Sequence, residues 1–280
     1  MTKNYLKLSI ITVHMDRNKY QRLPEEMKEF LKRLTLDGKS LNEISKITGL
    51  GKTTIYYQTK KLKVRQRKNF IIKLDDKQTG ELIGAFAGDG SYYHNSNKKL
   101  YHHKVRYHFC LSKDLDYAKY IKQLLQKLNL NPFMIPIPAQ NELNILVNSK
   151  DYIKFIKNFL EWEDNRTLSI RLKYPLDEYS NDFLVGFARA LMDCEGFVEV
   201  SNVSCACISK NLIINLSNIF DKFGIRYKLS IRKREGNRKD LYLIRVYRNS
   251  LKDYNKIISF ANKYKFDKLQ KIIKNEDTEI

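Results

Sequence analysis

The pattern of hydrophobic and polar positions changes near residue 73. Up to that point, three short stretches carry apolar residues three and four positions apart, which is typical of amphipathic helices. Beyond it, helical stretches alternate with pairs of shorter stretches in which polar and apolar residues alternate, as in strands that bury one face. The order helix, two strands, helix, two strands, helix is found twice. The pattern therefore predicts an α+β fold of two pseudo-symmetric αββαββα halves, preceded by a small all-α domain.

The predicted elements are similar in the two halves. The helix that begins each half ends at Gly90 in the first and at Gly196 in the second. In the first half we expect strands at 91–94, 104–111, 133–137 and 143–147, with helices at 114–128 and 151–160. In the second half we expect strands at 197–201, 203–208, 227–234 and 241–248, with helices at 211–223 and 252–263. Residues 161–178 cross over between the halves, and 236–237 supply the last hairpin turn.

Short sequence matches support the duplication. Residues 110–114 (CLSKD), 127–130 (KLNL) and 148–152 (NSKDY) correspond to 207–211 (CISKN), 222–225 (KFGI) and 249–254 (NSLKDY). Ser112 and Ser209 are the expected N-caps of the helices that follow. Repeats of about 100 residues are too long for a solenoid and indicate a duplicated domain. We therefore expect three parts: 1–72 with the N-terminal helices and a basic linker, 73–176 as the first repeat, and 177–280 as the second.

The N-terminal part resembles a helix-turn-helix DNA-binding unit. A strand is expected at 6–13, helices at 25–36, 41–48 and 52–63, and a basic linker at 63–73. Ser40 and Glu43 form a capping box, and glycines at 49 and 51 make a tight turn before the third helix. The expected core residues are Leu41, Ile44, Ile47, Leu50, Ile55 and Leu62. The residues expected to face a DNA groove are Lys52, Thr53, Thr54, Tyr57 and Gln58. A helical bundle used for protein contact is the alternative.

The two helices that begin the halves share a stripe of small residues. Residues 80–90 align without a gap with residues 186–196. Positions four apart lie on one helix face, so small side chains there let another backbone approach closely. We expect the two stripes to pack against each other. Their members are Gly80, Gly84 and Gly88 in the first helix and Gly186, Ala190 and Cys194 in the second.

This packing would place Asp89 and Glu195 side by side, with Gly90 and Gly196 ending the helices in left-handed geometry. Helix carboxyl ends carry partial negative charge, and two neighbouring carboxylates repel each other. A divalent cation would resolve both problems, and oxygen ligands favour Mg²⁺ or Ca²⁺ over zinc. For either acid alone, a helix that simply ends in an acid and a glycine remains the alternative.

Residues 82–90 and 188–196 resemble the two motifs of single-chain LAGLIDADG homing endonucleases. The resemblance implies that two pseudo-symmetric halves pack through the motif helices, and that saddle-shaped sheets grip double-stranded DNA. It also implies that Asp89 and Glu195 bind the Mg²⁺, or another divalent cation, that cleaves DNA. The family further places a basic residue near each metal centre, on the last strand of each half. Aligning 148–149 with 249–250 gives Arg245 this catalytic role and puts Asn144 opposite it.

The composition favours a nucleic-acid partner. Lys and Arg number 52 against 31 Asp and Glu, giving a net charge of +21 that is spread along the chain. The predicted strands carry basic side chains with the same parity, so that one sheet face can follow DNA. These are Lys104, Arg106, Lys228, Arg232, Arg234 and Arg245. The four cysteines show neither paired metal-site spacing nor a disulfide framework. Cys205 and Cys207 are expected in the core.

The sequence favours a site-specific endonuclease that acts as a monomer in the cytoplasm. It shows no signal peptide and no membrane span, and it lacks the terminal residues of an intact intein, so we expect a freestanding or intron-encoded protein. Two alternatives stay open. One is a DNA-binding transcriptional regulator that kept the fold but does not cut, and the other is a maturase that binds structured intron RNA.

Overall fold

The computed structural model describes residues 23–60, 62, 70–95, 102–236 and 238–278. The chain divides into two compact units, one ending at residue 67 and the other beginning at residue 68. The expected strand at 6–13 lies outside the described residues, as do residues 63–69 of the basic linker and position 237 of the hairpin turn. Among the described residues, no helix combines the length and the apolar character that crossing a membrane would require.

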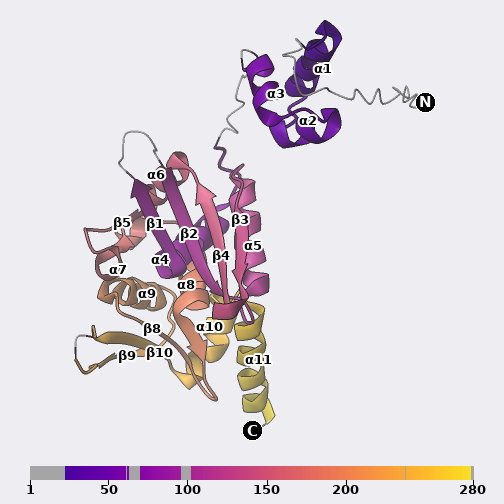
Figure 1. Cartoon of the computed structure of the whole chain (residues 1–280). Coiled ribbons are helices and arrows are strands. Elements are labelled where there is room, and N and C mark those ends of the chain that lie inside the picture. Colours follow the sequence, from indigo (N-terminus) through magenta and orange to yellow (C-terminus); the bar gives the residue numbers. More distant parts are fainter. Residues whose placement is uncertain (1–22, 61, 63–69, 96–101, 237, 279–280) are drawn as a thin grey trace. The chain divides into compact units, whose positions relative to one another are not determined.

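The first unit is a bundle of three short helices (Figure 1): α1 (Glu25–Leu36), α2 (Leu41–Thr48) and α3 (Lys52–Thr59). The capping box is confirmed, since the Ser40 side chain accepts from the Glu43 backbone and the Glu43 carboxylate accepts from the Ser40 backbone. Gly49 ends α2 with a left-handed φ of 70°.

Leu31, Ile44 and Ile55, one from each helix, make the small core of this unit. Leu34, Leu41 and Leu50 pack around them. The expectation that Ile47 belongs to this core was wrong, because its side chain is 52% exposed. Leucines of α1, which the sequence analysis left out, fill the space against Ile44, so the last turn of α2 stays outside the cluster.

The second unit confirms the predicted α+β fold of two matching halves. The elements of the first half are α4 (Asp76–Asp89), β1 (Gly90–Asn95), β2 (His102–Cys110), α5 (Leu115–Lys127), β3 (Phe133–Ile137), β4 (Glu142–Asn148) and α6 (Lys150–Phe159). Those of the second half are α8 (Asn181–Glu195), β7 (Gly196–Val198), β8 (Val203–Cys207), α9 (Lys210–Lys222), β9 (Tyr227–Arg232), β10 (Leu241–Val246) and α10 (Leu251–Ile257). Each half forms a four-stranded antiparallel sheet, in the order β1-β2-β4-β3 and β7-β8-β10-β9.

Some elements were not predicted. The crossover between the halves contains a small sheet of β5 (Leu160–Glu161) and β6 (Arg171–Leu172), and a short helix α7 (Arg166–Ser169). A last helix, α11 (Lys263–Thr278), follows α10. The helix expected at 252–263 ends at Ile257 instead, because the backbone at Ser259 turns to a left-handed φ of 57°. Ser209 caps α9 as expected, whereas α5 begins after Asp114 and Ser112 does not cap it.

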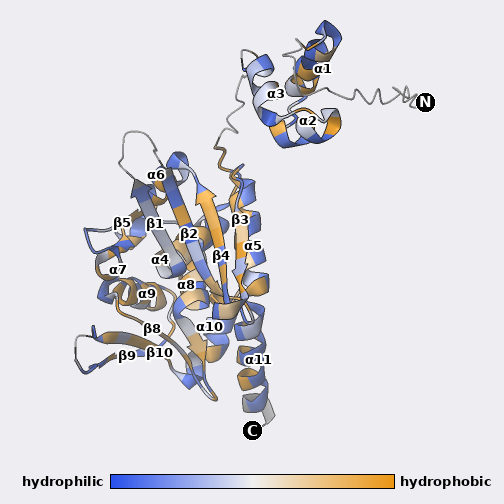
Figure 2. Ribbon diagram, viewed as in Figure 1, coloured by the Kyte–Doolittle hydropathy of each residue, from blue (hydrophilic) through white to orange (hydrophobic). Residues whose placement is uncertain are grey.

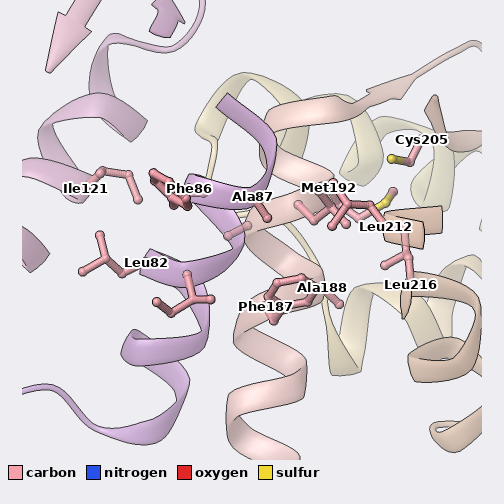
Figure 3. Packing of buried hydrophobic residues seen from close by; sticks show 14 of the residues in the cluster. Leu82, Phe86, Ala87, Ile121, Phe187, Ala188, Met192, Cys205, Leu212 and Leu216 are labelled. Carbon is pink, nitrogen blue, oxygen red and sulfur yellow. The ribbon is translucent and has the colours of Figure 1, made fainter. Parts of the chain in front are cut away.

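One hydrophobic core runs through both halves, with α4 and α8 at its centre. Figure 3 shows the two helices side by side: Leu82 and Phe86 of α4 lie toward Ile121 of α5, while Met192 of α8 lies toward α9. Each motif helix therefore packs against its own half on one side and against its counterpart on the other.

Cys205 and Cys207 are buried, as expected, on one face of β8. Figure 2 shows mostly hydrophilic residues along α11, in contrast to the hydrophobic colour of β4.

The small-residue stripes lie at the contact between α4 and α8. A Cβ added to Gly80 would lie 2.1 Å from the Phe183 carbonyl oxygen, and one added to Gly84 would lie 2.4 Å from the Phe187 carbonyl oxygen. On the other side, a Cβ on Gly186 would lie 2.1 Å from the Lys77 carbonyl oxygen. These neighbours are backbone atoms that cannot move aside, so the contact requires glycine.

The expectation of left-handed glycines at the helix ends was wrong. Gly90 has φ −81° and Gly196 has φ −85°, both in extended conformation, because the chain passes directly from each helix into a strand. Glycine is needed there for space instead. A Cβ at Gly90 would lie 2.5 Å from the Phe86 carbonyl oxygen, and one at Gly196 would lie 2.3 Å from the Met192 carbonyl oxygen.

Replacing Gly84 by alanine should destabilise the second unit by about 3 kcal/mol, since the new methyl group would force the two helices apart. Gly224→Asn is a matched control. Gly224 has φ 69° with nothing within 4 Å of an added Cβ, and the corresponding residue of the first half, Asn129, already adopts φ 60°. We expect the control to change stability by less than about 0.5 kcal/mol. Urea denaturation measures both, and equal effects of the two substitutions would contradict the packing.

Candidate active site

The carboxylates of Asp89 and Glu195 lie where α4 and α8 end. The last turns of the two helices touch, because a Cβ on Gly88 would lie 2.6 Å from the Cβ of Cys194 and 3.5 Å from the Cγ of Glu195. The Cys194 thiol donates a hydrogen bond to the Asp89 carboxylate. The packing of the two helices thus brings one acid from each half into the same small region.

This region disfavours two negative charges. Burial, with a smaller contribution from the charge of Glu195, raises the pKa of Asp89 to about 7. Burial also raises the pKa of Glu195 above its ordinary value. Both acids sit at helix carboxyl ends, where the backbone adds partial negative charge. A cation between them would offset this repulsion.

A basic side chain covers the carboxyl end of α4. Arg166, the first residue of α7, donates hydrogen bonds to the carbonyl oxygens of Phe86 and Ala87. Its guanidinium lies 4.6 Å from the centre of the Phe86 ring, a cation–π distance. Burial lowers the pKa of Arg166 to about 10, which still leaves it charged near neutral pH. Its charge lowers the pKa of Glu195, opposing the effect of burial.

A lysine covers the carboxyl end of α8 in the same way. The Lys265 ammonium, in the first turn of α11, donates to the last carbonyl oxygens of the helix, those of Met192 (3.3 Å), Asp193 and Cys194 (3.5 Å). Its positive charge lowers the pKa of both Asp89 and Glu195. Cations at helix carboxyl ends are favourable for the helix itself, and here they also lie beside the acids.

Arg166 and Lys265 were not predicted as site residues from the sequence. Arg166 lies in the crossover, to which no element was assigned, and Lys265 lies beyond the last predicted helix. The one signal that could have found them is a shared local pattern, since in each half an asparagine (Asn165 or Asn262) begins a helix that carries the cation in its first turn. That pattern is too common to be used without a structure.

Arg245, to which the sequence analysis gave a catalytic role, lies on the outer face of the second sheet. Its guanidinium is 3.6 Å from the Glu199 carboxylate and donates a long, 3.4 Å hydrogen bond to the Ser204 hydroxyl. Neither Asp89 nor Glu195 is among its described partners.

The strand registers also change its expected counterpart. In the first sheet Gly90 pairs with Tyr107, which pairs with Ile145. At the equivalent position of the second sheet, Gly196 pairs with Cys205, which pairs with Ile244. Arg245 follows Ile244 directly, so it corresponds to Leu146. The alignment of Arg245 with Asn144 was wrong. It was based on matching residues 148–149 with 249–250, and the second half has additional residues between its last strand and that match, so the sequence match and the strand pairing differ in register.

The basic residues predicted on the strands share the outer face of the sheets, away from the helices. On β2, Lys104 and Arg106 alternate with the buried Val105 and Tyr107. A hollow of about 350 Å³ lies beside them, lined also by residues 91–93 of β1. On the second sheet, Lys228, Arg232 and Arg245 point to the corresponding face. Arg234 lies just beyond β9 and donates to the carbonyl oxygen of Lys239 (2.5 Å).

In the first unit, the residues predicted to face DNA lie on the surface of α3. The side chains of Lys52, Thr53, Thr54 and Tyr57 are exposed, and Gln58 is half-buried. Ile55 and Thr59 are buried on the opposite face of the helix. The helix therefore presents one continuous polar and aromatic surface to solvent.

The residues present fit a hard divalent cation whose remaining ligands come from a substrate. Within the described part of the chain, no group of three or more His, Cys, Asp or Glu side chains is placed to hold a metal ion. Asp89 and Glu195 offer two carboxylates. Mg²⁺ is usually bound by one or two carboxylates together with water and substrate phosphates, so two acids suffice for that ion but not for a self-sufficient protein site.

The chain resembles known proteins in sequence and in fold. Residues 182–259 match the family model described as "LAGLIDADG-like domain". The replication factor C small subunit of Methanocaldococcus jannaschii is 28% identical over 207 residues, which is 72% of this chain and 10% of that protein. The chain thus spans about a tenth of the length of this curated relative.

Solved structures show the same fold. Mesophilic variants of the homing endonuclease I-DmoI superpose with a TM-score of 0.54 at 15% identity, covering 70% of this chain and 97% of that one. I-DmoI in complex with DNA and Ca gives a TM-score of 0.53 at 15% identity, again over 70% and 97% of the two chains. The second half of the chain thus matches the LAGLIDADG-like domain, and the second unit shares the fold of these endonuclease structures.

The raised pKa of Asp89 predicts a pH dependence of stability. The folded protein holds a proton on Asp89 that the unfolded chain releases near pH 4, so the free energy of unfolding should fall as pH rises from about 4 to 7, by up to about 1.4 kcal/mol per pH unit. Asp89→Asn removes this loss. Without divalent metal we expect the variant to be more stable than the native protein at about pH 8, and the difference to shrink toward about pH 4.

Urea denaturation in a chelating buffer across this pH range measures the effect. Asp164→Asn, which changes an exposed carboxylate in the loop before α7, is the control and should show no such trend. A constant difference between Asp89→Asn and the native protein at all pH values would contradict the assignment.

Proposed function

We propose that the chain is a site-specific, divalent-metal-dependent DNA endonuclease that cuts both strands as a monomer. The observation that carries the proposal is that Asp89 and Glu195, one from each half, lie at the ends of two helices whose backbones touch at glycine positions. One chain supplies both acids, so no second copy is needed. The LAGLIDADG fold and the net charge of +21 support the same function.

In this proposal Asp89 and Glu195 would hold Mg²⁺, and the chemistry that the ion would supply is activation of a water molecule and stabilisation of the leaving oxygen. The acids share the region with Lys265, whose charge lowers the pKa of both, and with Arg166, whose charge lowers the pKa of Glu195. The same two cations would also stabilise negative charge on the phosphate group. Arg245, half exposed on the outer sheet face, would contact the DNA backbone and not the reacting phosphate.

The outer faces of the two sheets would hold the duplex. Basic side chains at regular positions on strands can follow the two phosphate backbones, and the hollow beside Lys104 and Arg106 gives the first sheet room for a base edge or a phosphate. The exposed face of α3 would add contacts to a separate part of the target, as recognition helices do.

Removal of either acid should abolish cleavage. The target is first obtained by selecting cleaved sequences from a DNA library in the presence of Mg²⁺. On that target we expect Asp89→Ala and Glu195→Ala to lose cleavage of both strands while the dissociation constant for DNA changes by less than about threefold. Asp164→Ala is the matched control and should cut normally. Tight binding without cleavage by the native protein would contradict the proposal and favour a non-cleaving regulator, while tighter binding to intron RNA than to DNA would favour a maturase.

The basic sheet faces predict a strong salt dependence of binding. If six to ten phosphates are contacted, affinity should fall by roughly 10³- to 10⁵-fold between 50 and 200 mM salt. The double variant Arg106→Gln, Lys228→Gln should lower the slope of log affinity against log salt by about two. Lys119→Gln, on the helical side of the first half, should leave the slope unchanged. Fluorescence anisotropy measures the slopes, and equal slopes for all three proteins would rule out this binding face.

A further inference from the structure

Asp193 is a buried carboxylate of the second motif that has no counterpart in the first. Residue 87, at the aligned position of the first motif, is alanine. The two carboxylate oxygens of Asp193 accept hydrogen bonds from the backbone N–H groups of Ala261 and Asn262, both at 3.0 Å. A buried carboxylate with two backbone donors is held in one geometry, and so is the backbone that donates to it.

The backbone held in this way is the start of α11. The Asn262 side-chain oxygen accepts from the backbone N–H of Tyr264 (3.0 Å) and of Lys265 (3.4 Å), which is an N-cap arrangement. Its side-chain amide donates to the Asp114 carboxylate of the first half at 2.7 Å. The first turn of α11 is therefore fixed from both halves at once, by Asp193 on one side and Asp114 on the other.

Lys265 lies in that first turn, and its ammonium contacts the carboxyl end of α8 beside Asp193. Its Nζ donates to the backbone carbonyl oxygens at the end of α8, including that of Asp193 itself. A lysine side chain is long and flexible, so the position of its charge depends on how firmly its backbone is held. Asp193 thus binds the backbone just before α11 with its carboxylate and accepts from the Lys265 ammonium with its carbonyl oxygen.

We propose that Asp193 is a positioning residue that places the Lys265 ammonium beside Asp89 and Glu195 through the Asp193–Asn262–Asp114 clamp. The inference rests on the proposed endonuclease function. Asp193 faces the start of α11 and needs no metal for this role. Its contribution is to keep one cation at a fixed place while DNA binds and is cut.

The first half fixes its cation by other means. Arg166 lies over the Phe86 ring at 4.6 Å and donates to the end of α4, and the alanine at 87 offers no carboxylate there. A change at Asp193 should therefore affect cleavage only through Lys265. This makes the clamp testable by the coupling between substitutions, since residues that act through each other show non-additive effects.

Single-turnover cleavage of the selected target tests the clamp. We expect Asp193→Asn to lower the cleavage rate by roughly 10- to 100-fold, because displaced catalytic groups cost rate, with a change in DNA affinity of less than about twofold. In a Lys265→Met background the same substitution should cause no further loss. In an Arg166→Met background it should keep its full effect.

A second variant guards against simple misfolding. Asn262→Ser keeps an N-cap oxygen for α11 but removes the amide that reaches Asp114, and it should show the same coupling to Lys265→Met. Thermal denaturation identifies which variants are folded. Native cleavage by a folded Asp193→Asn, or an equal loss in both backgrounds, would overturn the positioning role while leaving the endonuclease intact. No cleavage by the native protein would overturn both proposals.

Discussion

The close contact between α4 and α8 is the constraint on which the rest of the molecule depends. Carbonyl oxygens of each helix lie where the side chains of Gly80, Gly84 and Gly186 would begin, so the two backbones are in direct contact there. The contact fixes the orientation of the two halves, because each helix also packs into the core of its own half. The same contact also brings the carboxyl ends of the two helices together, and with them Asp89 and Glu195.

The two halves share this plan but have diverged around it. Each helix end is covered by one cation, yet Arg166 stacks on an aromatic ring whereas Lys265 is presented by a clamped helix. The outer face of the first sheet has Leu146 where the second has Arg245. None of these differences disturbs the contact between α4 and α8.

The sequence predicted the parts that depend on local rules. The capping box at Ser40, the strand at Phe133–Ile137 and the small-residue stripes follow from spacing alone. The predictions failed where contacts with residues distant in the sequence determine the conformation or position of a residue. The glycines at 90 and 196 are extended because a strand must leave at once, and no local signal reveals that. Arg166 and Lys265 reach helix ends far away in the sequence, so only the fold brings them to the acids.

The most direct test of the central claim is the position of Mn²⁺ in crystals of the protein with its selected DNA target, measured by anomalous scattering. The account predicts peaks within coordination distance of both Asp89 and Glu195, about 2.0–2.3 Å from carboxylate oxygens, with further ligands from DNA phosphates. Peaks bound at other residues, or Asp89 and Glu195 occupying separate sites with no shared metal region, would contradict it.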